Sequence, residues 1–267
     1  MSFDSLMALD LNQQLLSFYE KNIGCLDVVE EAKTKLSSPL LMLANETYYL
    51  NPDRRVIVWG QETNGWGTCF KTYQRLIEQS PKSAALNRMS GHYEFLQGRY
   101  NSVFWRAFCE LAQVTQKSEL LQSSFLWGNV FALDYAQGSI LKKVPKDLKE
   151  NVVSGVSCYS EKMFRAEIEI LKPRIMVFFT GLNGSYDRYL KLPKDWSLDN
   201  IGSLPECKEK KSPCLGWVKT FELDGIRCFK TYHPGYLSRL KGLESIKIIS
   251  DTIQNILKIE EDENAAV

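Results

Sequence analysis

The sequence predicts an α/β fold, a three-layer α/β/α sandwich whose central sheet has four mostly parallel strands and one antiparallel edge strand. Short apolar runs, typical of parallel strands covered on both faces, alternate with segments of helical periodicity. An Asp-Gly pair between two further apolar runs is typical of a β-hairpin and predicts the antiparallel strand. The expected parallel strands are residues 55–60, 125–131, 175–179 and 226–231, and the expected edge strand is residues 217–223.

Helices are expected on either side of the first strand. Residues 5–21 and the stretch near 27–37 carry apolar residues at helical spacing, and residues 70–79 have the pattern of a short helix. The segment 80–98 is polar and irregular, so we expect it to lie over the surface without regular structure.

The second half of the chain contains the longest irregular segment, residues 182–215. Its polar composition favours a solvated loop over a DNA-contacting element. Residues 142–149 are expected to form a basic loop or a short helix. Three more helices are expected: residues 103–116 behind the cap Ser102, the stretch from Ser160 to Pro173, and residues 243–259, after which the acidic tail is expected to fray.

A single domain is expected from 267 residues that contain no internal repeat and no low-complexity linker. It would comprise N-terminal helices (1–50), a core that carries the sequence motifs (55–240) and a C-terminal helix (243–259), and we expect a monomer. The net charge is +1, so any nucleic acid would have to bind a local basic patch.

The ends and the cysteines of the chain favour the cytoplasm. Residues 1–13 contain Asp4 and Asp10 and lack the basic start and apolar run of a secretion signal. No apolar run approaches the ~20 residues that a membrane span requires. The seven cysteines form no C-x-x-C pair, so we expect reduced thiols; an iron–sulfur cluster is the alternative, but the spacing does not suit it. We expect no membrane binding, no metal and no cofactor.

Polar side chains stand at the ends of the four parallel strands, where ligands bind in open α/β sheets. Glu62, Asn129 and Thr180, together with His233, are far apart in the sequence. Because the carboxyl ends of parallel strands lie at one edge of a sheet, we expect these four side chains to meet at one site.

Two of these strand ends resemble motifs of the uracil-DNA glycosylase superfamily. Residues 60–65 are Gly-Gln-Glu-Thr-Asn-Gly where its best-known branch has Gly-Gln-Asp-Pro-Tyr-His. Residues 233–238 are His-Pro-Gly-Tyr-Leu-Ser where that branch has His-Pro-Ser-Pro-Leu-Ser. Residues 67–70 match its Gly-x-Cys-Phe, and Asn129 matches the Asn that contacts the base edge. The resemblance covers roughly residues 55–240 and implies the fold of this superfamily.

The resemblance implies a monofunctional DNA glycosylase that hydrolyses the N-glycosidic bond of a flipped-out base and leaves an abasic site. Breaking this bond builds positive charge on the sugar and negative charge on the base. By resemblance, Glu62 takes the place of the Asp that orients the attacking water, although its side chain is one methylene longer. His233 would donate a hydrogen bond to the base carbonyl oxygen beside the bond. These two are the expected catalytic residues.

The resemblance also indicates which residues would hold the base and the DNA. Asn129 offers an acceptor and a donor to a pyrimidine edge, and Phe70 offers a stacking face. Leu237, with Tyr236 beside it, would wedge into the duplex when the nucleotide flips. The expected base-binding residues are Gln61, Thr63, Asn64, Phe70 and Asn129, and the expected DNA-binding residues are Tyr236, Leu237, Ser238, Arg239 and Lys241.

A departure from the family indicates the base. In the uracil-specific branch, a Tyr of the first motif stands against carbon 5 of the pyrimidine; this chain has Asn64 there, and Thr63 replaces the preceding Pro. We therefore expect excision of a C5-modified pyrimidine, such as a modified phage cytosine, in a defence role. Uracil excision in DNA repair is the alternative. In that case Trp66 would move toward carbon 5 and take the place of the missing Tyr.

Each of these residues also has a purely structural interpretation. Gly60 and Gly67 would make a tight turn, and Asn129 would satisfy backbone groups at a strand end. Phe70 and Leu237 would be core residues, as most side chains of these types are. We assign three tryptophans to the core and expect the second histidine to be incidental: Trp59, Trp105, Trp127 and His92.

Two other functions remain open at this point. A nucleic-acid-binding module on the same fold without catalysis is favoured by the change from Asp to Glu at position 62 and by the missing Pro-Tyr. An unrelated α/β protein that binds a nucleotide or another small molecule is disfavoured, because the chain has neither a G-x-G-x-x-G nor a G-x-x-x-x-G-K-[ST] loop.

Overall fold

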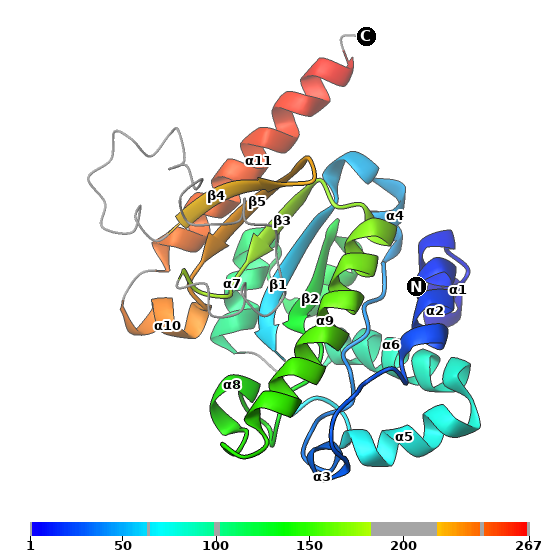
Figure 1. Ribbon diagram of the computed structural model, residues 1–267. Helices are drawn as coiled ribbons and strands as arrows, with labels where there is room; N and C mark the ends of the chain where they lie inside the picture. The colour runs from blue at the N-terminus through cyan, green and yellow to red at the C-terminus, as the bar shows by residue number, and fades with distance from the viewer. Residues whose placement is uncertain (1, 63–64, 99–101, 183–217, 241–242, 266–267) are drawn as a thin grey trace.

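A five-stranded sheet in the order β2-β1-β3-β5-β4 lies at the centre of the structure, a computed structural model that describes residues 2–62, 65–98, 102–182, 218–240 and 243–265. Every neighbouring pair of strands is parallel except β4 and β5. The expected sheet of four parallel strands with an antiparallel edge strand is confirmed (Figure 1). The strands are β1 (Val56–Glu62), β2 (Phe125–Phe131), β3 (Ile175–Phe178), β4 (Val218–Leu223) and β5 (Ile226–Thr231).

Side chains of β1 alternate between two hydrophobic clusters, one on each face of the sheet. Trp59 belongs to the cluster that contains the inner side of α9 (Lys149–Leu171). Val58 belongs to the other cluster, which contains residues of α7 (Val103–Ala112) and α11 (Glu244–Ala265). Figure 1 shows α9 on one side of the sheet and α7 and α11 on the other. These helices complete the three layers that the sequence predicts.

The hairpin between β4 and β5 forms as expected. Its two central residues, Asp224 and Gly225, have φ angles of 48° and 77°, and two positive φ angles define a type I′ turn. The register pairs Leu223 with Ile226 directly across the turn. The turn chemistry therefore sets the position of β5, whose end carries part of the predicted site.

The N-terminal region differs from the prediction of two helices over 5–21 and 27–37. The first is divided at Leu9, whose backbone is extended (ψ 136°), because the Asn12 side chain donates to the carbonyl oxygens of Leu6 and Ala44 and holds the two parts at an angle. The second shortens to one turn, since residues 36–40 instead bond to the segment after β2 and to residues 68–70. The elements here are α1 (Phe3–Met7), α2 (Asp10–Asn22), α3 (Glu30–Lys33), α4 (Glu46–Leu50) and the 3-10 turn η1 (Pro52–Arg54).

The prediction of an irregular surface segment over 80–98 is wrong. The helix α5 (Phe70–Gln79) is present as expected, and α6 (Pro81–Gln97) follows it. Ser80 caps α6 and proline occupies its first turn, a start signal that the polar composition of the segment conceals. The buried side of α6 consists partly of alanines and a histidine, which do not stand out as an apolar stripe: Ala84, Ala85, Met89, His92 and Leu96.

The other helices keep their expected places but change their bounds. The hydroxyl of Ser102 caps α7, which ends at Ala112 because Gln113 adopts a left-handed backbone (φ 55°). The helix expected to begin at Ser160 begins at Lys149 instead. Ser160 therefore lies inside this helix, and its hydroxyl accepts the N–H of Ala132, which follows β2 (3.1 Å). The C-terminal helix runs through the acidic tail that was expected to fray. The remaining elements are the 3-10 helix η2 (Lys117–Gln122), α8 (Ile140–Lys143) and α10 (Pro234–Arg239).

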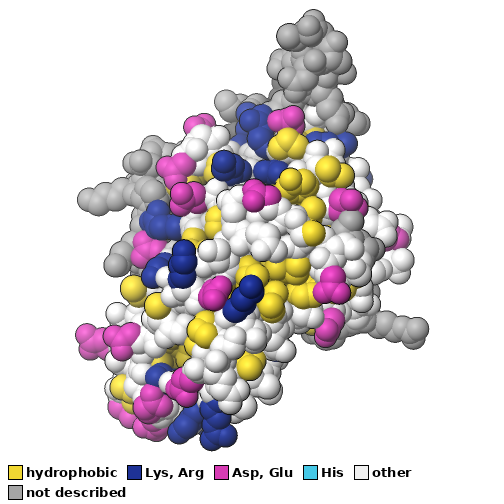
Figure 2. All heavy atoms as spheres, turned by 90° about the vertical axis from the view of Figure 1, so that its right-hand side faces the viewer, with side chains coloured by type: hydrophobic (Ala, Val, Ile, Leu, Met, Phe, Trp, Pro, Cys, Tyr) yellow, Lys and Arg dark blue, Asp and Glu magenta, His cyan; other side chains and the backbone are white. Residues whose placement is uncertain are grey.

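The surface around the N-terminal helices has no field of one sign. Figure 2 faces the side on which α1 and α2 lie in Figure 1, and its basic and acidic side chains are interspersed. This distribution agrees with the net charge of +1. Among the described helices, none has both the length and the apolar composition that crossing a bilayer requires.

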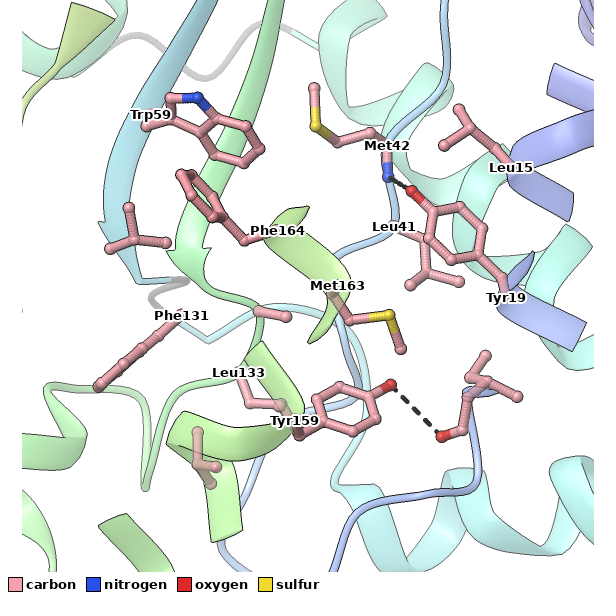
Figure 3. Packing of buried hydrophobic residues seen from close by; sticks show 14 of the residues in the cluster. Leu15, Tyr19, Leu41, Met42, Trp59, Phe131, Leu133, Tyr159, Met163 and Phe164 are labelled. Carbon is pink, nitrogen blue, oxygen red and sulfur yellow. Dashed lines mark hydrogen bonds between the residues drawn. The ribbon is translucent and has the colours of Figure 1, made fainter. Parts of the chain in front are cut away.

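The cluster beneath α9 contains a buried carboxyl group. Figure 3 shows the packing there: the Trp59 and Phe164 rings lie 4.6 Å apart, and the Met42 N–H donates to the Tyr19 hydroxyl (3.0 Å). The Tyr19 hydroxyl in turn donates to the Glu167 carboxyl group (2.6 Å), which is 4% exposed. Burial raises the pKa of Glu167 to about 8, although the Tyr19 hydrogen bond acts in the opposite direction. The buried carboxyl group is therefore mainly protonated at neutral pH.

We expect Glu167 to make the fold less stable as pH rises. The folded carboxyl group keeps its proton up to pH about 8, whereas the unfolded group loses it near 4.5, so the folded state binds more protons in between. Its contribution to the free energy of unfolding should fall across that window, with a slope of at most about 1.4 kcal/mol per pH unit. The Glu167→Gln variant should lack this slope.

The measurement is the free energy of urea unfolding at pH 5 and pH 8. The difference between wild type and Glu167→Gln isolates the contribution of this group from those of the histidines. The matched control is Glu169→Gln, an exposed position on the same helix. Equal pH slopes for wild type and Glu167→Gln would show that the buried carboxyl group does not hold its proton.

Candidate functional site

The strand order brings four polar strand ends to one edge of the sheet. Glu62 ends β1, Asn129 lies on β2, Thr180 follows β3 and His233 follows β5, and these four strands are parallel. Because β2 and β3 lie on opposite sides of β1, the chain reverses its direction across the sheet at β1, and ligands of open α/β sheets bind at such a switch point. We call the space over these strand ends the crevice. Figure 1 shows α8 and α10 at this end of the sheet.

Asn129 lies against the backbone of β1 at a glycine. Gly60 and Asn129 are register partners, and a Cβ atom built on Gly60 would lie only 2.2 Å from the Asn129 Oδ1 atom. Gly60 therefore lies within the strand rather than in a turn, and it is required so that the Asn129 amide can lie over β1. The Gln61 side chain next to it reaches the segment after β3, donating to the carbonyl oxygen of Thr180 (3.4 Å).

Glu62 is held by the first turn of α8. Its Oε2 atom accepts the backbone N–H of Ile140 (2.8 Å), and its side chain is half-buried. A backbone donor bonded to a carboxylate favours the ionised form and fixes its orientation. The expected catalytic carboxylate therefore has a defined position beside the crevice.

His233 caps α10 and is neutral at pH 7. Its Nδ1 atom accepts the backbone N–H of Gly235 (3.1 Å). Burial, and then the positive charge of Arg239, lower the pKa of His233 to about 4. A neutral imidazole carries one proton, and since Nδ1 is an acceptor, the proton is on Nε2. The site therefore contains an uncharged N–H donor.

Asp134 anchors the loop after β1, and the motif comparison missed it. This residue is 1% exposed, and its Oδ2 atom accepts the N–H groups of Gly65 (2.7 Å) and Trp66 (3.4 Å). Residues 65–69 line a pocket of about 290 Å³ together with residues 34–37, Asp134, Ala136 and Gln137. An acidic residue shortly after a buried strand is the signal that could have identified Asp134.

Trp66 is fixed on the α6 side of the site. Its indole N–H donates to the carbonyl oxygen of Pro39 (3.2 Å), and its ring meets Phe95 and Trp127 edge-on at 5.3 and 5.9 Å. Movement of this ring into the crevice would break all three contacts.

Two residues expected at the surface are in the core. Phe70 is 2% exposed and belongs to the cluster beneath α9, and Leu237 is fully buried beside α7, so neither offers a face to DNA in this structure. The α10 side chains on either side of Leu237, those of Tyr236 and Ser238, are exposed instead. The structural interpretation of Phe70 and Leu237 is therefore correct, as it is for Trp59, Trp105 and Trp127.

The ring in the crevice is that of Phe104, which the sequence comparison did not single out. Its Cε2 atom would lie 3.5 Å from a Cβ atom on Gly60, and its ring stacks on the His233 imidazole with centroids 5.8 Å apart. Nothing in the linear pattern separates Phe104 from the core aromatics of α7, because only the packing of that helix places it at the strand ends.

The exposed side of α10 combines aromatic, polar and basic groups. The Tyr232 and Tyr236 rings lie 4.9 Å apart, and the Arg239 guanidinium lies over the Tyr236 ring at 5.8 Å. Ser238, Arg239 and Leu240 are exposed. This surface directly follows His233. Three residues of the prediction lie outside the described part of the chain: Thr63, Asn64 and Lys241.

Buried polar atoms without partners also occur near the crevice. The hydroxyl groups of Thr180 and Thr231 have no hydrogen-bond partner among the described residues, and the N–H of Gly181 joins these strand ends by donating to the Thr231 carbonyl oxygen (3.0 Å). His92, which was expected to be incidental, is buried in α6 and stacks on Trp127. Within the described residues, no three His, Cys, Asp or Glu side chains are grouped so as to hold a metal ion.

Comparisons of the sequence with known protein families and with curated proteins found no match.

Proposed function

We propose that the protein is a monofunctional DNA glycosylase. The observation that carries the proposal is the placement, at the same end of the parallel strands, of an oriented carboxylate (Glu62) and a neutral imidazole donor (His233). Hydrolysis of an N-glycosidic bond needs these two groups, because positive charge develops on the sugar and negative charge on the base. The motif resemblance to the uracil-DNA glycosylase superfamily supports the same assignment.

In the proposed reaction, the bond between the anomeric carbon and the base nitrogen breaks and its electron pair leaves with the base. The Glu62 carboxylate stabilises the oxocarbenium-like sugar and orients the water that attacks it. The Nε2–H of His233 donates to the base carbonyl oxygen, where negative charge collects. The attacking water loses one proton as it adds to the sugar, and one proton completes the released base. No metal or cofactor takes part.

Asn129 supports the assignment of a pyrimidine substrate. Its amide is fixed against β1 at Gly60, and it offers both an acceptor and a donor. Gln61, Thr63 and Asn64 complete the proposed base-binding residues.

The proposed DNA surface is the exposed side of α10. Tyr236, which is 42% exposed, takes the wedge role that was expected of Leu237, since an aromatic side chain can insert where a base has flipped out. Ser238 and Arg239 would contact the backbone, as would Lys241. We place the protein in the cytoplasm as a monomer; the described cysteines, which are all free thiols, agree with a reducing compartment.

Loss of either catalytic group should slow chemistry more than binding. Glu62→Gln keeps an oxygen for the Ile140 N–H but loses the negative charge, and His233→Ala loses the donor. Each should slow base release by about two or more orders of magnitude, with DNA affinity nearly unchanged.

Single-turnover release is measured on modified duplexes, with hot alkali to cleave the abasic strand, and affinity is measured by fluorescence anisotropy. The control is Glu169→Gln. Wild-type rates in both variants would contradict this site, whereas DNA binding by a wild-type protein that leaves no alkali-labile sites would favour a binding module without catalysis.

Arg239 should contribute one phosphate contact. Removing it in Arg239→Ala should weaken binding equally across sequences and reduce the slope of log affinity against log salt by about one unit. The matched control is Arg227→Ala, an exposed arginine near the opposite end of β5. A slope that is unchanged in Arg239→Ala would remove α10 from the proposed interface.

The proposed substrate is a C5-modified pyrimidine, which would make the protein a defence enzyme. Asn64 stands in the sequence where the uracil-specific branch has its Tyr, and the three contacts of Trp66 disfavour its movement into the pocket as a replacement. We expect release of hydroxymethylcytosine or its glucosylated form from duplexes that carry one test base. Release of uracil alone, with none from the C5-substituted bases, would establish the repair alternative instead.

A further inference from the structure

The Phe104 side chain lies beside all four parallel strands or the residues that follow them. Its ring lies edge-on to Phe179, just after β3, at 5.8 Å, and to Trp127 on β2 at 6.4 Å. It stacks on the His233 imidazole at an interplanar angle of 24°, and it lies beside β1 at Gly60. Its position comes from the first turn of α7, so a separate helix inserts this ring into the crevice.

We propose that Phe104 is the positioning residue of His233, holding the face of the imidazole so that its Nε2–H points into the crevice. This inference rests on the proposed function in one respect only, namely that the Nε2–H of His233 donates to the base. The contact itself belongs to the fold and can be tested without any substrate.

Two contacts of different kinds constrain the imidazole. The hydrogen bond from Gly235 to Nδ1 acts in the plane of the ring and selects the tautomer. The Phe104 ring stacks on the imidazole with the centroids 5.8 Å apart, so a tilt of the imidazole toward it would have to displace the ring. With the hydrogen bond alone, the ring could tilt, and water could solvate its protonated form. Both contacts are therefore needed for a fixed, neutral donor.

The charges around His233 do not provide this constraint. The charged group that acts on it is Arg239 of α10, which lowers its pKa but contributes less than burial does. Phe104 belongs to α7 and is uncharged, so replacing it changes the packing and the solvation of the imidazole and leaves Arg239 in place.

The test is the titration of the two histidines by NMR in Phe104→Leu. The chain has only two histidines, so His92, whose pKa burial lowers to about 4 as well, serves as an internal reference. We expect the His233 midpoint to rise from about 4 toward 6.5 by at least about one unit while that of His92 stays in place. His233→Gln assigns the signals, and Phe104→Tyr, which keeps the ring, should restore the wild-type midpoint.

Phe108→Leu is the matched control. Phe108 lies one turn along α7 and contacts Phe104 at 6.4 Å, but it is fully buried in the core. Its replacement should lower the melting temperature at least as much as Phe104→Leu and leave the His233 titration unchanged. If Phe104→Leu does not fold, Phe104→Met, which also lacks the ring, takes its place.

A rate profile connects the titration to the proposed chemistry. If the His233 midpoint moves to about 6, its neutral fraction at pH 5 falls about tenfold, and base release should fall with it, but much less at pH 8. An unmoved His233 midpoint in Phe104→Leu would overturn the inference, whatever the enzymatic activity. A moved midpoint in a protein that releases no base would instead retain the inference and reject the proposed reaction.

Discussion

The site depends on β1 changing from apolar to polar residues without leaving the sheet. Up to Trp59 the strand is buried, paired on both sides, and supplies both hydrophobic clusters. From Gly60 to Glu62 the same pairing with β2 continues while the side chains become small or polar. The rigidity of the core therefore extends to the carboxylate, and the absent side chain of Gly60 leaves the space that Asn129 occupies.

The sequence predicted the sheet because its signals are local. Buried parallel strands are continuous apolar runs, and the Asp224-Gly225 turn has its own conformational signature. The helix α6 was missed because its buried side includes alanines and a histidine, which tertiary packing, and not hydrophobicity, places inward. The motif resemblance assigned base stacking to Phe70. A match of residue types does not show on which face of the sheet a side chain lies, and Phe70 lies in the core beneath α9. The ring that reaches the crevice, that of Phe104, comes from another helix.

Burial keeps His92, His233 and Glu167 neutral at pH 7, but of these three only His233 lies at the candidate site. Desolvation is the largest cause of the pKa shifts of His92, His233 and Glu167, lowering the first two and raising the third. The shift alone therefore does not mark function. The His92 Nε2–H donates to the carbonyl oxygen of Trp127 deep in the core, whereas His233 lies at the strand ends and is only partly buried. Position at the sheet edge separates the site histidine from the structural one.

The chain between Glu62 and Gly65 connects two fixed points. The Ile140 N–H holds the Glu62 carboxylate at one end, and the Asp134 carboxylate holds the Gly65 N–H at the other. Both anchors come from the segment that follows β2, so they belong to one rigid part of the fold. The Glu62 carboxylate is therefore held by a contact outside positions 63 and 64, and substitutions there leave that contact in place.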